Sequence, residues 1–367
     1  MTTTDFTALT LVQNAHTTLS PDGDGQPIFA ITLDVYKQFS FFVDVVLTTL
    51  VCIIGIAGNS TGLYVLSKDQ SPKRMAIHTY LIFLMSVDII YLTVGLVLSA
   101  FYVIEMTDKR IGDVIRTSTL LYRPYIDNLL NYTSTLLLIC MSFERLLALI
   151  APFRSKASVL TRYPGVIICL SVSAMGIFLI PFITSFYVEE SFMEGNYTRI
   201  VMTLKPEFES LFKVTSFVSN LFLHYLAPCI MLVVNLITLS AFSKYRRQRA
   251  HILRSRQNSR RQARITVVIV VVVALYLLLS LPNIFIHTLM LINTEYGYYG
   301  KYRLTFLVCV RVGDLLARIN ASADVFVYIL ICQQYRVIVG AMCIGSCRRG
   351  QRQDGQRKQE VWRVDIK

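Results

Sequence analysis

Charged residues interrupt the long apolar runs of this 367-residue chain at a few places where they could bind a cation or exchange partners. Asp127 and Arg145 stand eighteen residues apart near the two ends of one run, roughly 27 Å along a helix, close to the thickness of a bilayer core. Asp88 lies in the middle of another run, where an unpaired carboxylate is costly, so it marks a functional site or a structural hydrogen-bond centre. For Asp127 and Arg145, snorkelling to the two membrane faces is the simpler alternative.

The elements that carry these residues are predicted to be membrane-spanning helices. With 54% hydrophobic and 16% charged residues, the chain is too apolar for one soluble core of its length. Each apolar stretch is long enough to cross a bilayer. We expect seven spans, at 38–66, 77–104, 118–150, 164–187, 212–243, 264–292 and 304–332.

The distribution of Lys and Arg predicts which side of the membrane each loop occupies. Of the 36 basic residues, 23 lie in the first, third and fifth connections and after the seventh span. Basic residues gather on the cytoplasmic side, so the N-terminus is expected outside and the C-terminus inside. The net charge of +13 then reflects topology and anionic lipid, not binding to nucleic acid.

The parts outside the spans complete the predicted domain organisation. Residues 1–36 are polar and read as a flexible extracellular tail, and residues 37–332 form the membrane domain. Residues 333–347 are amphipathic and predict a short surface helix, in which Cys343 and Cys347 are candidates for palmitoylation. Residues 348–367 are polar, basic and expected to be disordered.

Short motifs occur in a fixed order along these spans. They are GN in the first span, LMSVD in the second, SFERLLALIAPFR at the end of the third, one Pro in each of the fifth and sixth, and NASADVFVY in the seventh. From about 35 to 345 the chain resembles rhodopsin-family (class A) G-protein-coupled receptors, most like invertebrate neuropeptide receptors. The resemblance implies an all-α membrane protein, a seven-transmembrane helix bundle with a short cytoplasmic amphipathic helix 8.

The resemblance also implies a bound sodium ion and no other cofactor. In this family the buried Asp of the second span and its partners hold sodium, and their positions here are occupied by Asp88, Ser134, Asn320 and Asp324. All four offer the oxygen ligands that a hard cation prefers. Because two of them are acidic and would titrate as a coupled pair, a proton can take the place of sodium.

The switch residues of the family are present only in altered form. Asp-Arg-Tyr appears as Glu144-Arg145-Leu146, and Asn-Pro-x-x-Tyr ends in Tyr328. The resemblance implies that Arg145 and Tyr328 engage a heterotrimeric G protein.

Three family features are absent from the sequence. Leu120 replaces the cysteine that ties the third span to an outer loop, and Ser280 replaces the Trp two residues before Pro282, leaving Tyr276 as the nearest aromatic pivot. Gln262 replaces the acidic partner of Arg145 at the foot of the sixth span. Arg145 can still pair with Glu144, so we expect a weakened inactive-state lock.

The family's ligand pocket maps onto polar residues of the third, fifth, sixth and seventh spans. Asp127 occupies the position at which amine receptors and several peptide receptors hold a ligand cation, and Arg318 is expected to form an ion pair with it. Asp314 lies one turn above Arg318. The other expected lining residues are Asn220, His224, Asn283 and His287, although either histidine could instead have a core role.

The predicted outer loops are acidic and aromatic. Residues 188–211 contain five Glu and the sequon at Asn196, a candidate for glycosylation, and residues 293–303 contain four Tyr. Such a rim suits a basic peptide through charge steering and cation–π contacts, while a merely solvated acidic face is the alternative.

We therefore predict a multi-pass plasma-membrane receptor, not an enzyme, that binds an extracellular neuropeptide and activates a heterotrimeric G protein. A biogenic-amine receptor using Asp127 is the alternative of the same class. A non-signalling seven-helix scaffold and a secondary transporter are alternatives of other classes.

Overall fold

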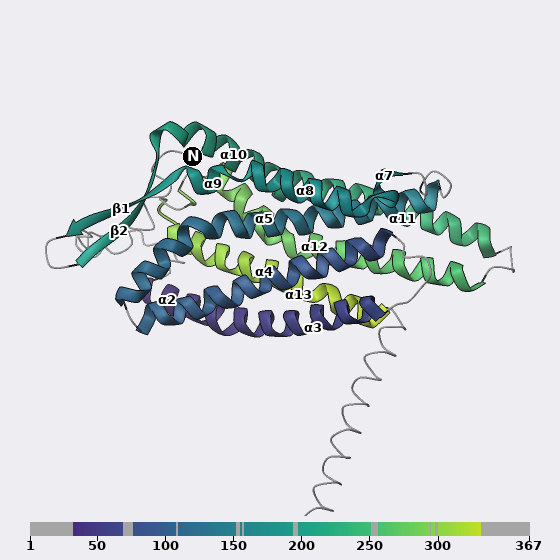
Figure 1. The fold of residues 1–367 in the computed structure, drawn as a ribbon, viewed down its shortest axis with the longest axis horizontal. Coiled ribbons are helices and arrows are strands. Elements are labelled where there is room, and N and C mark those ends of the chain that lie inside the picture. Colours follow the sequence, from purple (N-terminus) through teal and green to yellow (C-terminus); the bar gives the residue numbers. More distant parts are fainter. Residues whose placement is uncertain are drawn as a thin grey trace, which may run out of the picture.

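The computed structural model describes residues 32–68, 76–107, 109–151, 155, 158–193, 197–250, 256–293, 295–297 and 300–331. Long helices lie side by side in one bundle, and a two-stranded hairpin extends from one end of it, called the hairpin end (Figure 1). The amphipathic helix expected at 333–347, Cys343, Cys347, Asn196 and most of the polar tails lie outside the described residues and stay predictions.

The first span is one continuous helix made of α2 (Leu33–Phe41), the π-helical segment η3 (Phe42–Leu47) and α3 (Thr48–Lys68). It begins five residues before the expected position because the Thr32 side chain caps it, accepting a hydrogen bond from the Val35 amide at 3.4 Å. The wider π turn changes the direction of the following side chains.

The second and third spans, α4 (Ala76–Thr107) and α5 (Lys109–Ile150), are separated by one residue. Gly112 permits this tight connection, because a Cβ atom there would lie 2.7 Å from the Cα atom of Glu105. With 42 residues, α5 is longer than the predicted span, and its apolar part begins only at Tyr122. Pro124 lies inside the helix, and Figure 1 shows α5 bending near its start.

The fourth span is α8 (Pro164–Phe178) followed by the short helix α9 (Pro181–Thr184), and α7 (Val159–Arg162) precedes it. The segment expected to be a loop at 188–211 instead forms the antiparallel strands β1 (Phe186–Met193) and β2 (Tyr197–Leu204). Residues 197–204 are rich in β-branched side chains, which favour strands. One small sheet is thus added to the predicted helical fold.

The fifth span follows the 3-10 turn η4 (Pro206–Phe208) and comprises α10 (Glu209–Leu221), the π-helical segment η5 (Phe222–Leu226) and α11 (Ala227–Ala250). The sixth span is α12 (Arg256–Ile292), with Pro282 inside it. The seventh is α13 (Arg303–Ile331).

Within the described residues, six helical stretches are long and apolar enough to cross a membrane, and α13 is not among them. The reason is its charged residues: after Arg303 at its start, α13 contains Arg311, Asp314, Arg318 and Asp324. It nevertheless packs against α3, α4 and α12 as part of the bundle. Two of these charges, Arg311 and Asp314, form ion pairs with other helices of the bundle.

Apolar side chains fill most of the interior of the bundle and also cover much of its outer surface. The largest buried cluster joins α3, α4, α5, α8, α11, α12 and α13, and it includes Tyr80, Met141 and Val273, none of which has any exposed surface. Large apolar side chains such as Val166 and Phe285 are exposed on the outer surface of the helices. This arrangement suits a protein whose surroundings are lipid tails.

Candidate functional site

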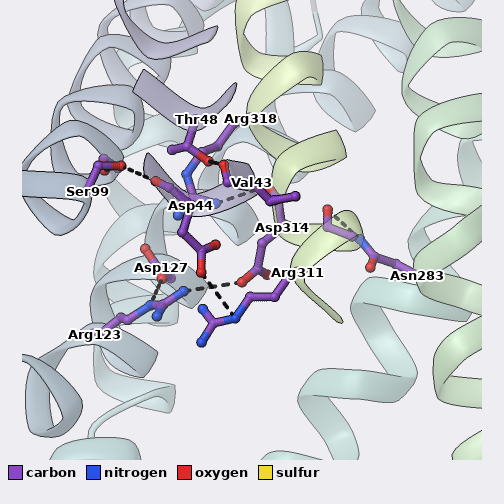
Figure 2. Close-up of polar contacts among 12 residues, drawn as sticks. Val43, Asp44, Thr48, Ser99, Arg123, Asp127, Asn283, Arg311, Asp314 and Arg318 are labelled. Atoms are coloured by element: carbon purple, nitrogen blue, oxygen red, sulfur yellow. Dashed lines mark hydrogen bonds and ion pairs between the residues drawn. The ribbon is translucent and has the colours of Figure 1, made fainter. Parts of the chain in front are cut away.

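Arg123 joins two helices near the hairpin end by contacting two carboxylates. Its Nε atom donates to Asp127 Oδ2 at 3.1 Å on the same helix, and its Nη2 atom donates to Asp314 Oδ2 at 3.2 Å on α13. Figure 2 shows the guanidinium between the two acidic side chains. Arg123 thereby links α5 to α13.

A second ion pair lies beside the first. Arg311 Nε is 3.4 Å from Asp44 Oδ2, which connects α13 to the π segment η3 (Figure 2). The wider turn of η3 leaves backbone carbonyls in need of donors. Ser99 of α4 donates to the Asp44 carbonyl at 2.6 Å, and Thr48 donates to the Val43 carbonyl at 2.9 Å.

The expected ion pair between Asp127 and Arg318 is wrong. Asp127 pairs with Arg123, which is one helical turn away and easily reaches it. Arg318 turns away towards α4: its Nη1 atom donates to the backbone carbonyl of Asp314 at 3.1 Å, and its guanidinium lies 5.8 Å from the ring centroid of Tyr91. A Cβ atom at Gly95 would stand 2.7 Å from Arg318 Nε, so the buried arginine needs this glycine.

These six residues form a charge cluster with three carboxylates and three guanidinium groups: Asp44, Arg123, Asp127, Arg311, Asp314 and Arg318. Sequence reasoning identified Asp127, Asp314 and Arg318 but missed the other three. A signal was present for Arg123, which lies four residues before Asp127 on the same helix. Asp44 stands within the first predicted span, where any charge needs a partner.

The other residues expected to line the pocket are brought together only in part. His224, in the π segment η5, stacks on His287 of α12 with ring centroids 3.8 Å apart. Next to them Tyr225 and Thr288 share a hydrogen bond of 3.1 Å. These two contacts tie the fifth and sixth spans together.

Asn283 and Asn220 take no part in this ring contact. Asn283 donates to the Gly313 carbonyl at 3.4 Å and so links α12 to α13. Asn220 is partly buried on α10.

The middle of the bundle contains the residues expected to hold sodium. Ser134 donates to Asp88 Oδ1 at 3.1 Å, and Asp88 and Asp324 are both 2% exposed. Among the described residues no hydrogen-bond partner reaches Asp88 Oδ2, Asn320 Oδ1 or Asp324 Oδ1. Buried oxygens without donors are costly, and a hard cation would satisfy them. The residues present therefore fit a sodium ion.

Asn59 connects the first and seventh spans beside this site. Its Nδ2 atom donates to the Gly55 carbonyl at 3.1 Å and to the Ala321 carbonyl at 2.9 Å. Ser322 of α13 donates to the Val51 carbonyl at 3.1 Å. Together these bonds fix α13 against α3.

The predicted pairing of Glu144 with Arg145 is confirmed. Arg145 donates from Nε to Glu144 Oε2 at 2.6 Å and from Nη2 to Oε1 at 3.0 Å, and both side chains are buried. Tyr328 lies on α13, but its side chain is outside the described part of the structure. Arg145 is thus held by its own helix.

Tyr276 lies between the third and sixth spans. Its hydroxyl is 3.3 Å from Thr135 Oγ1 of α5, and it also interacts with Ser280, one turn along α12 and two residues before Pro282. Near Arg145, Asn235 of α11 donates to Ser142 Oγ at 3.3 Å. Movement of α12 would have to break the Tyr276 contact.

The family comparison agrees with this arrangement. The family model of the 7 transmembrane receptor (rhodopsin family) matches residues 58–320, from the first span to the seventh. No curated protein matches the chain. Because the match covers well over half of the 367 residues, the chain belongs to the rhodopsin family of seven-transmembrane receptors.

Proposed function

We propose that this plasma-membrane receptor, which as a member of its family signals through heterotrimeric G proteins, responds to an extracellular peptide. The observation that carries the proposal is that Arg123 already occupies both Asp127 and Asp314. A small amine carries one positive charge and few other groups, and with these alone it would have to displace the Arg123 guanidinium. A peptide can make further contacts around the charge cluster and so offset the lost ion pairs.

The segments around the hairpin end support a peptide more than an amine. Glu189 and Glu190 stand on β1, and Glu209 begins α10, where it pairs with Lys213. The aromatic rim expected from the sequence is smaller than predicted, because Tyr296 is buried against the Phe306 ring at 5.4 Å. Acidic charge is therefore the main attraction we assign to this surface.

We place the hairpin end outside the cell and the basic ends of α11 and α12 inside. Support comes from the Lys and Arg counts of the connections. In this orientation Asn196, next to β2, would be glycosylated, and Cys343 and Cys347 would be palmitoylated at the inner face.

The proposed mechanism is a two-state switch biased by the ligand. In the resting state Arg123 joins α5 to α13 and Arg145 is held by Glu144. Ligand binding at the charge cluster would favour a state in which α12 moves outward, breaking the contact of Tyr276 with Thr135. Arg145 and Tyr328 would then engage the G protein. A sodium ion at Asp88 would be held in the resting state, with Ser134, Asn320 and Asp324 as the other ligands.

The test is G-protein dissociation in cells that express wild type or Arg145→Ala at matched surface levels. Both are measured without ligand and against panels of basic peptides and biogenic amines. The proposal expects a peptide response in wild type that Arg145→Ala loses. A response to amines alone would favour the amine receptor, and identical behaviour of the two proteins would favour a non-signalling scaffold. Family membership decides against a transporter.

A further inference from the structure

The Arg123 guanidinium binds between two helices in the way that the cation of a ligand could. Its guanidinium uses two nitrogens on two carboxylates that come from different helices, at 3.1 Å from Asp127 and 3.2 Å from Asp314. The three side chains are 25% to 39% exposed, so they lie within reach of water. Between these helices the charge cluster therefore contains a preformed cation site that the chain itself fills.

The charges around the site define what it can accept. With Arg123 in place, three carboxylates face three guanidinium groups. Without Arg123 the remaining five groups carry one net negative charge, because Arg311 stays with Asp44 and Arg318 stays near Tyr91. The vacated site thus suits one monovalent cation.

Arg123 is placed where its side chain can reach water, since it is 29% exposed. The residue precedes Pro124 and lies at the start of the apolar part of α5, which begins at Tyr122. From the end of a membrane helix a long Arg side chain can turn into water. Release also leaves Asp127 with two free oxygens, since its Oδ1 atom is buried with no hydrogen-bond partner among the described residues.

We propose that Asp127 and Asp314 form a guanidinium-binding site between α5 and α13, and that Arg123 is an internal occupant which the arginine side chain of a peptide ligand displaces. The step from a guanidinium site to a peptide arginine rests on the proposed function above. The site itself does not depend on that function.

Geometry favours a guanidinium over an ammonium group. The planar guanidinium presents several N–H donors in a fixed fork and can bridge two carboxylates, as Arg123 does. A lysine ammonium is a compact, strongly hydrated charge, and its three donors lie close together. Arginine should therefore displace Arg123 better than lysine in the same peptide.

Chemical complementation of the full-length receptor, purified in detergent, tests the site without any agonist. Arg123→Ala removes the internal guanidinium and leaves space for a small one. We expect the melting temperature to fall by several degrees, because Asp127 and Asp314 then lack their cation. Added methylguanidine should restore it in a saturable manner, while methylammonium at the same concentration should restore little.

Two controls separate binding from a general salt effect. Wild type should show no stabilisation by methylguanidine, because Arg123 fills the site. The double variant Arg123→Ala/Asp314→Asn should also show none, because only one carboxylate remains. Equal stabilisation by methylammonium, equal stabilisation of the double variant, or no stabilisation of Arg123→Ala would overturn the proposal.

Arg123→Lys tests the bridge without opening a cavity, and serves if Arg123→Ala is not recovered in folded form. Its ammonium can meet one carboxylate, so the melting temperature should fall below that of wild type. A wild-type melting temperature would contradict the bridging role. Because melting requires neither agonist nor G protein, these results stand apart from the cell assay of the peptide-receptor function.

Discussion

Arg145 and its neighbour Glu144 form a buried ion pair with two hydrogen bonds, of 2.6 Å and 3.0 Å. Consecutive residues of a helix normally point in different directions, so both side chains must turn towards each other. The sequence places Gln262 where family members have an acidic partner for Arg145. In the proposed mechanism, the lock of the resting state is therefore local to α5.

Replacing Glu144 by Gln should raise signalling in the absence of ligand. The change removes the negative charge that holds Arg145 and should cost about 1–3 kcal/mol of folding free energy, because charge-assisted hydrogen bonds are lost in a buried place. We expect ligand-independent G-protein dissociation to rise several-fold at equal surface expression. Glu144→Asp keeps the negative charge, so its ligand-independent G-protein dissociation should lie between that of wild type and that of Glu144→Gln. Basal activity equal to wild type in Glu144→Gln would contradict the lock.

The contact of Tyr276 with Thr135 can be measured by a double-mutant cycle. Tyr276→Phe removes a buried hydroxyl that bonds across α5 and α12, and should destabilise the receptor by about 1 kcal/mol. Thr135→Val should cost a similar amount. If the two side chains bond each other, the double variant should cost less than the sum of the single changes in thermal unfolding. Strict additivity would show that they do not interact.

Gly55 is predicted to be intolerant of any side chain. A Cβ atom there would lie 2.2 Å from Ser322 Oγ and 2.6 Å from Leu92 Cδ1, where α3, α4 and α13 meet. Gly55→Ala should therefore destabilise the receptor by about 1–3 kcal/mol through overpacking. Gly165→Ala is the matched control, since nothing lies within 4 Å of its added methyl group. Similar melting temperatures for both variants would refute the close packing.

Sodium should stabilise wild type more than Asp88→Asn. Exchange of sodium chloride for choline chloride at constant ionic strength should lower the melting temperature of wild type, because a ligand of the folded state is removed. Asp88→Asn should respond weakly, since a carboxylate that faces the unsatisfied oxygens is gone. An equal response of the two proteins would argue against a sodium ion at this place.

The sequence alone determined most of the helical architecture. Continuous apolar stretches of bilayer length predicted all seven spans, including α13, although the charges of α13 keep it outside the six stretches that are apolar enough to cross a membrane by composition. The pairing of Glu144 with Arg145 was also predictable, because no acidic residue stands at the position of Gln262. These features depend on local composition or on residues that are neighbours in the chain.

Tertiary structure decided which charges meet across the bundle. Arg123 takes Asp127 and Asp314, while Arg318 turns towards Tyr91. The elements that bring these charges together contain the π turn of η3, Pro124 inside α5 and the space left by Gly95. A π turn and an internal proline change the direction of the helix that follows, and Gly95 leaves room for the Arg318 side chain. The partner of a charged side chain depends on how its helix is rotated relative to the neighbouring helices. The residue pattern of a single segment does not determine that rotation.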